Sequence, residues 1–196
     1  MYDFAPGHHR VLDRVLYPVT KFLHLQLGLT PNQLSVIGFV VGLAAAVFLA
    51  VKEIEIGLVV LAMSQFIDGI DGSIARVFHL RSYLGARLET VFDRVNEFFL
   101  FLALAFIGEV TYTILVLAFT AILLMTLIRE RSRFDPGFKR VSLYFGYFVG
   151  FQLVLTLVFA VNLFGFVVSL LMLDYAFQKQ LDQAPSVSSH ASSPKE

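Results

Sequence analysis

The sequence predicts an all-α integral membrane protein, in which six transmembrane helices follow an amphipathic helix in the membrane interface. Hydrophobic residues make up 57% of the 196-residue chain, and its mean hydropathy of +0.75 is far above that of soluble domains. Uncharged runs long enough to cross a bilayer recur along it. The chain has no cysteine, which excludes disulfides and thiol chemistry. A net charge of zero gives no bias toward nucleic acid, and none is expected as a partner.

Residues 1–30 are expected to form a cytoplasmic, interfacial segment. Apolar residues recur at helical spacing between Val11 and Leu23, with Asp13, Arg14 and Lys21 among them. This pattern is typical of a helix that lies in the membrane interface. A soluble cap helix has the same pattern and remains an alternative.

Six spans are expected in one membrane domain over residues 31–180. Val141–Leu173 is uncharged but would be about 50 Å long as one helix, too long for a hydrocarbon core about 30 Å thick. We expect Asn162–Gly165 to break it into two helices. The preceding spans are expected at Leu34–Val51, about Ile56–Phe78, about Tyr83–Ile107 and Val110–Ile128.

Basic residues set the expected orientation. The loops on one side carry most of them, while the opposite loops carry a single Lys. The positive-inside rule therefore places both termini at the cytoplasmic face of the membrane. The polar tail over residues 181–196 is low in complexity and is expected to be disordered.

Four carboxylates interrupt the second and third spans. Asp68 and Asp71 are three residues apart, and Glu89 and Asp93 are four apart, so each pair shares one helix face. Charge within a membrane is costly and normally faces a polar cavity, an ion or a partner. Two such faces in contact would gather four carboxylates, which indicates a site for Mg²⁺ or Mn²⁺ rather than zinc.

Residues between the acids favour a pyrophosphate ligand. Gly72 and Ala75 lie on the first acidic face, and Gly85 comes one turn before Glu89. These small residues leave space for a ligand to approach the backbone closely. Arg76 presents several donors to anionic oxygens.

The pattern resembles the signature of the CDP-alcohol phosphatidyltransferases, D-x2-D-G-x2-A-R-x8-G-x3-D-x3-D, over residues 68–93 with every spacing kept. One position departs, because Glu89 stands where the family has Asp. The resemblance covers about residues 28–145. It implies transfer of a phosphatidyl-type group from a CDP-activated lipid to a small polar alcohol, with release of CMP and two Mg²⁺ or Mn²⁺ ions. It also implies the homodimer that the family commonly forms, and it leaves the alcohol and the diacyl or archaeal lipid open.

The resemblance also implies roles for single residues. Asp68, Asp71 and Glu89 would bind metal, while Asp93 would bind metal and act as general base. The CDP-lipid would be bound by Thr30, Pro31, Asn32, Gly72, Ala75, Arg76, Ser82 and Gly85. From the residues alone, the acids could instead form structural ion pairs with Arg76, Arg87 or Arg94. Thr30 and Pro31 could equally be the cap and first position of a helix.

Two less specific features remain. Glu97 continues the acidic stripe, either near the metals or as an ion-pair partner of Arg94. Arg129, Arg131 and Arg140 are candidates for binding a phosphate of the acceptor. The segment around Arg129 resembles the family's Tyr-x-x-Arg-Ala-Arg region, but it lacks the Tyr and has Glu130 in place of Ala. Lipid headgroups and the positive-inside rule explain these charges equally well.

A different class of function stays open. A non-catalytic relative, or a divalent-cation transporter, would also gather acids, and the Glu89 substitution favours it. Against transport, the acids cluster toward one membrane face, and the other spans carry no charge that would continue a path.

Overall fold

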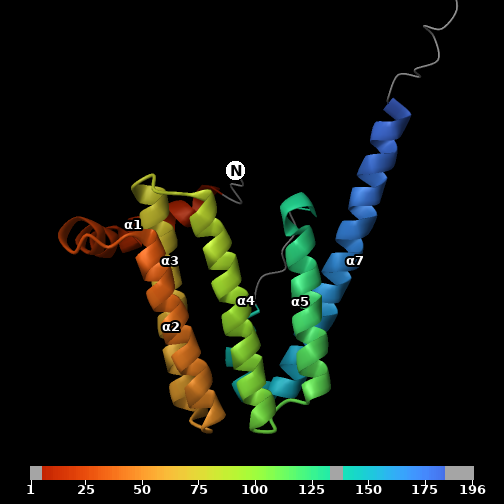
Figure 1. The fold of residues 1–196 in the computed structure, drawn as a ribbon, viewed down its shortest axis with the longest axis horizontal. Coiled ribbons are helices and arrows are strands. Elements are labelled where there is room, and N and C mark those ends of the chain that lie inside the picture. Colours follow the sequence, from red (N-terminus) through yellow and green to blue (C-terminus); the bar gives the residue numbers. More distant parts are fainter. Residues whose placement is uncertain (1–5, 133–138, 184–196) are drawn as a thin grey trace, which may run out of the picture.

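The computed structural model describes residues 6–132 and 139–183, which form helices and no strand within these ranges. Long helices stand side by side, and α1 crosses one end of the bundle (Figure 1). The elements are α1 (Pro6–Lys21), the π-helical turn η1 (Phe22–Gln26), α2 (Pro31–Ala50), α3 (Ile54–Val77), α4 (Tyr83–Phe106), α5 (Tyr112–Ser132), α6 (Ser142–Val149) and α7 (Phe151–Gln183).

The long helices pack in two groups. Helix α2 packs on α3 and α4, α5 packs on α7, and α4 joins the groups through α5 (Figure 1). A bare Gly57 lets α3 approach α2, because a Cβ there would lie 2.8 Å from Leu49 Cδ2. One hydrophobic core spans both groups and includes the fully buried Leu49, Leu61, Phe101, Leu104, Ile122 and Leu155.

The outer surface of the bundle is apolar. Large hydrophobic side chains are exposed on each long helix, among them Val40, Val59, Val91, Val116 and Phe164. Within the described residues, Pro31–Ala50 and Phe151–Tyr175 are long and apolar enough to cross a membrane. Helices α3 and α4 have 24 residues each, which is also sufficient length, but they carry the acids.

The predicted break at Asn162–Gly165 is wrong. Helix α7 runs from Phe151 to Gln183 without interruption, and the chain instead turns at Gly150, whose φ is 96°. Asn162 does not end the helix because its buried amide donates to the Val158 carbonyl of the preceding turn at 2.8 Å. Gly150 permits the turn because residues with a Cβ rarely adopt this backbone conformation.

Six complete transmembrane helices are therefore not present in the part of the chain that the structure describes. Helix α6 has eight residues and rises about 12 Å, too little to cross a bilayer. The first four predicted spans do correspond to α2–α5 within a few residues. Helix α1 and the final turns of α7 lie at the same end of the bundle (Figure 1).

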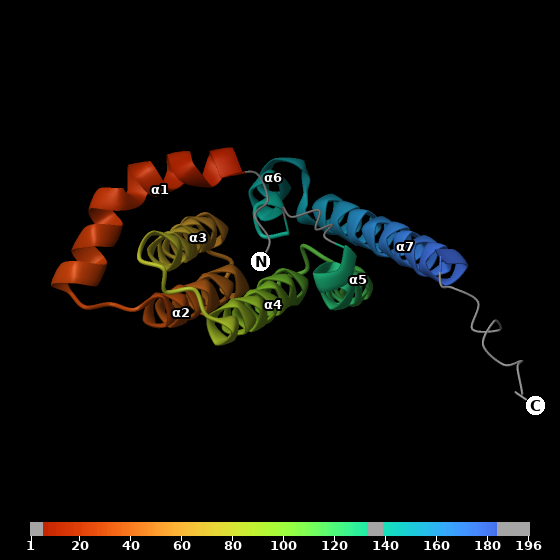
Figure 2. The same ribbon diagram turned by 90° about the horizontal axis from the view of Figure 1, so that it is seen from above.

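The predicted N-terminal helix is present and is docked on the bundle. It curves alongside α3 (Figure 2), where Leu16 is buried with Leu34, Ile70 and Ile74 in a second apolar cluster. The His24 ring of η1 packs against Phe78 with the centroids 4.5 Å apart. The opposite side of this segment leaves large apolar side chains exposed, namely Val15, Tyr17, Val19, Phe22 and Leu25. It thus combines a packed inner face with an apolar outer face suited to a membrane interface.

Candidate active site

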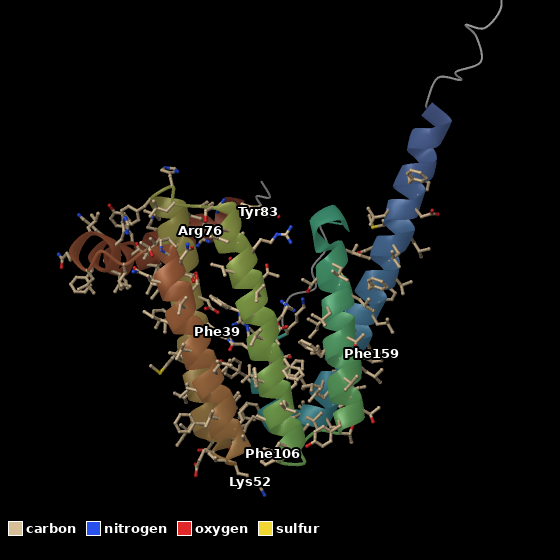
Figure 3. All side chains as sticks on the ribbon, viewed as in Figure 1. Phe39, Lys52, Arg76, Tyr83, Phe106 and Phe159 are labelled. Carbon is tan, nitrogen blue, oxygen red and sulfur yellow. The ribbon has the colours of Figure 1, made fainter. Side chains whose placement is uncertain are left out.

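The four acids lie on α3 and α4, which both pack on α2, in the half of each helix toward Arg76 and Tyr83. Arg76 near the end of α3 and Tyr83 at the start of α4 lie at the end opposite Lys52 and Phe106 (Figure 3). The structure brings the acids together, because Asp71 interacts electrostatically with Asp68 and Glu89, and Asp68 with Asp93. Asp71 is buried and Glu89 is exposed, so the cluster extends from the interior to the surface.

Arg140 links the two helices through their acids. Its Nη1 donates to Asp68 Oδ2 at 2.9 Å, and its Nη2 donates to Asp93 Oδ1 at 2.7 Å. Charge-assisted bonds of this length fix both carboxylates and the guanidinium in place. Of the three basic candidates for the acceptor phosphate, Arg140 is thus at the acids, while the side chains of Arg129 and Arg131 lie outside the part that the structure describes.

Helix α2 contributes two residues beside the acids, Ser35 and Gly38, that were not predicted from the sequence. Ser35 Oγ lies 2.5 Å from Asp71 Oδ2, to which it donates, and 3.1 Å from the Pro31 carbonyl. One turn further, a Cβ on Gly38 would lie 2.5 Å from Asp68 Oδ1, so any larger residue there would displace this carboxylate. A signal did exist in the sequence, since Ser35, Gly38 and Gly42 recur at helical spacing as small residues within an apolar span.

The starts of α2 and α4 meet beside the acids. Thr30 Oγ1 accepts from the Gln33 backbone N–H while Gln33 accepts from Thr30 N–H, and Pro31 takes the first helical position. This confirms the predicted cap. Ser82 caps α4 by accepting from Gly85 N–H at 3.0 Å. A Cβ on Gly85 would lie 3.0 Å from Asn32 Oδ1, so the two predicted nucleotide segments are in contact. Both helix starts direct backbone N–H groups to this end, an arrangement that favours anions.

The basic residues near the motif have distinct partners. Arg76 forms an ion pair with Asp13 of α1 at 2.7 Å. Arg94 Nη1 lies 2.6 Å from Glu97 Oε2, which confirms the ion pair expected for the buried Glu97. Arg87 donates to the Tyr83 hydroxyl at 2.9 Å.

The donor chemistry of the cluster fits divalent ions, although the carboxylates do not converge. Among the described residues, no three His, Asp or Glu side chains are close enough to hold one ion. Carboxylate oxygens are nevertheless the ligands that Mg²⁺ and Mn²⁺ prefer. Glycines lie beside two of these acids, because the bare Gly38 admits Asp68 Oδ1 and the half-buried Gly72 follows Asp71.

Acids thus lie between the helices of an apolar bundle that also has two capped helix starts. A sequence model of the CDP-alcohol phosphatidyltransferase family matches residues 28–177, and the chain belongs to this family.

Named relatives extend this similarity. The chain is 32% identical over 88 residues to the archaetidylinositol phosphate synthase of Pyrococcus horikoshii. The matched segment covers 45% of this chain and 47% of that enzyme. The match thus spans about half the length of that relative. This chain is also 29% identical over 150 residues to the Escherichia coli inner membrane protein YnjF. That match covers 69% of this chain and 73% of YnjF.

The fold resembles that of a solved enzyme. The Mycobacterium tuberculosis phosphatidylinositol phosphate synthase with CDP-DAG bound superimposes with a TM-score of 0.64 at 18% identity, over 81% of this chain and 91% of that one. The same enzyme in complex with manganese and citrate gives a TM-score of 0.62 at 16% identity, over 91% of this chain and 94% of that one.

Proposed function

We propose that this chain is a membrane phospholipid-biosynthetic transferase that moves a phosphatidyl-type group from a CDP-activated lipid to a small polar alcohol and releases CMP. The observation that carries this proposal is that the four signature acids of α3 and α4 are near enough to interact in pairs, with Arg140 bonded to Asp68 of α3 and Asp93 of α4. Family membership supports the reaction class. The fold shared with an enzyme that has been solved with CDP-DAG bound supports a donor of this kind.

The donor's nucleotide and pyrophosphate would lie at the contact between the two helix starts. Thr30, Pro31 and Asn32 border it from α2, while Ser82 and Gly85 border it from α4. Gly72 and Ala75 of α3 leave room for the phosphates, and Arg76 would bind their oxygens. Backbone N–H groups at both helix starts would add to the attraction for this anion.

The acids would hold the divalent ions. Asp68, Asp71, Glu89 and Asp93 would bind two Mg²⁺ or Mn²⁺ ions, which neutralise the pyrophosphate and stabilise the leaving CMP when bound. Ser35 would orient Asp71 for this task through its 2.5 Å hydrogen bond. The solved structure of the similar enzyme with manganese supports a divalent metal.

Asp93 would accept the proton of the acceptor. The acceptor oxygen would form a bond to the lipid-linked phosphorus while the bond from that phosphorus to the CMP oxygen breaks, and the hydroxyl proton would pass to the Asp93 carboxylate. Arg140 contacts Asp93 at 2.7 Å, which supports a role for its guanidinium in binding an acceptor that carries its own phosphate, such as inositol phosphate or glycerol phosphate.

Domain limits, orientation and assembly remain proposals. Residues 1–30 would form the interfacial segment and 31–180 the membrane domain, although α7 continues to Gln183. The site would face the cytoplasm, because the basic stretch that includes Lys139 and Arg140 would lie on that side. The protein would contact membrane lipids and form a homodimer.

The direct test is CMP release from CDP-diacylglycerol by the purified full chain in detergent, with a panel of alcohols and either Mg²⁺ or Mn²⁺. We expect release that requires both the metal and one of the alcohols. Metal-dependent binding of the lipid without release, for every alcohol and for an archaeal CDP-lipid, would identify a non-catalytic relative. Cation flux into liposomes would instead identify a transporter.

A further inference from the structure

Helix α1 is held against the end of α3 that carries Arg76. Leu16 packs in the cluster with Ile70 and Ile74, and Thr20 is fully buried. Asp13 lies three residues before Leu16 and therefore on the same face of α1. The docking of α1 thus fixes the position of the Asp13 backbone relative to α3 (Figure 2).

Asp13 holds one edge of the Arg76 guanidinium. Arg76 Nε donates to the two Asp13 oxygens at 3.1 and 3.0 Å, and Nη2 donates to Oδ1 at 2.7 Å. Only 20% of the Arg76 side chain and 19% of the Asp13 side chain is exposed. A two-point contact that is this well covered restricts the rotation of the guanidinium far more than an exposed pair does.

The opposite edge of Arg76 faces the motif. The guanidinium carries five N–H bonds, and the contacts with Asp13 use those of Nε and one of Nη2. The Nη1 group lies 3.1 Å from the point where a Cβ on Gly72 would stand, so it reaches over the bare backbone next to Asp71. Asp13 and Gly72 together therefore place the Nη1 edge over the bare backbone of the motif, next to Asp71 in sequence.

We propose that Asp13 is a positioning residue for the CDP-lipid, because it presents the Nη1 edge of Arg76 to the pyrophosphate. The inference rests on the proposed function. It assigns the interfacial helix α1 a part in donor recognition, in addition to membrane contact. It also predicts the direction in which the affinity for the CDP-lipid changes when Asp13 is replaced. If Asp13 only competed with phosphate for Arg76, its removal would tighten donor binding. If Asp13 positions Arg76, its removal weakens donor binding.

The test compares the parent with Asp13→Asn, which keeps the shape of the side chain and removes its charge. We expect both the KM of CMP release and the Kd of CDP-diacylglycerol in nanodiscs, measured without acceptor, to rise about tenfold, with kcat within about twofold of the parent. Asp13→Glu restores the carboxylate and should bring both constants to within about threefold of the parent. Arg14→Gln, an exposed change on the same helix, is the matched control and should leave both unchanged.

A double-mutant cycle separates positioning from a general loss of α1 packing. In an Arg76→Gln background, Asp13→Asn should change the Kd by less than about twofold, because its effect passes through Arg76. A penalty as large as that in the parent, an unchanged Kd, or tighter binding by Asp13→Asn would overturn the inference. A parent that binds CDP-diacylglycerol but releases no CMP would instead refute the proposed transfer, and the Kd comparison would still decide the role of Asp13.

Discussion

At the scale of single residues, the acid cluster depends on neighbours that carry no charge. Ser35 donates to Asp71, and the bare Gly38 leaves the space that Asp68 Oδ1 occupies. Groups that orient metal-binding carboxylates typically change metal affinity by 10- to 100-fold when they are altered. Glu89 departs from the family pattern, because its side chain is one methylene longer than the Asp that the family has there. It is also exposed on α4.

Gly38→Ala should perturb the site more than the fold. Its Cβ would stand 2.5 Å from Asp68 Oδ1, and the end of this flexible side chain can move aside. We expect about tenfold weaker Mn²⁺ binding, measured by electron paramagnetic resonance, with little loss of thermal stability. Gly42→Ala controls for a clash on the same helix, because its Cβ would meet the buried Asn96 rather than an acid, so it should lower thermal stability without weakening Mn²⁺ binding. Equal Mn²⁺ affinities in parent and Gly38→Ala would mean that Asp68 does not bind the ion.

The sequence indicates which acids share a helix face but not which residues surround them. The spacing of Asp68, Asp71, Glu89 and Asp93 implies two acidic helix faces because helical periodicity is local, and in the structure the acids interact in pairs. The contacts around the site join residues that are far apart in sequence. The separation is 36 positions for Ser35 and Asp71 and 63 for Asp13 and Arg76. Arg140 is 72 positions from Asp68 and 47 from Asp93. Such pairs depend on helix packing, which a single sequence does not specify.

At the scale of elements, the first four spans were predicted well because each is a long apolar run with a clear boundary. The C-terminal run was predicted less well, since composition alone does not locate a turn within it. Asn162 and Gly165 looked like a break, yet Asn162 bonds to its own helix and Gly150 makes the turn. The α6–α7 corner is also tight, because a Cβ on Gly146 would stand 2.5 Å from Phe151 Cδ1.

Gly150→Ala should therefore destabilise this corner. Its φ of 96° is strained for any residue with a Cβ, and such strain costs on the order of 1–3 kcal/mol. We expect a lower midpoint of thermal unfolding in detergent. Gly69→Ala in α3, where a Cβ would meet nothing within 4 Å, is the control and should be neutral or mildly stabilising. A midpoint for Gly150→Ala that matches or exceeds the parent's would contradict the turn at Gly150.

At the scale of the whole molecule, several elements contribute residues to the candidate site. Helices α3 and α4 supply the acids, α2 supplies Ser35 and Gly38, and α1 supplies Asp13, while the segment before α6 delivers Arg140. The bundle around them has an apolar outer surface, so a lipid tail would stay among exposed hydrophobic side chains while its polar head reaches the acids. Arg76 and Tyr83 mark the end of the bundle from which a soluble alcohol would enter (Figure 3). This arrangement suits a reaction between a membrane lipid and a water-soluble alcohol.

If the acid cluster transfers the phosphatidyl-type group with Asp93 as the base, Asp93→Asn removes the carboxylate that accepts the proton of the acceptor. The measurement is the turnover of CMP release from CDP-diacylglycerol at saturating metal and acceptor, together with the Kd of the lipid. We predict that turnover falls by at least about two orders of magnitude while the variant remains folded and its Kd for the lipid stays near that of the parent. Near-parental turnover by Asp93→Asn would contradict the account.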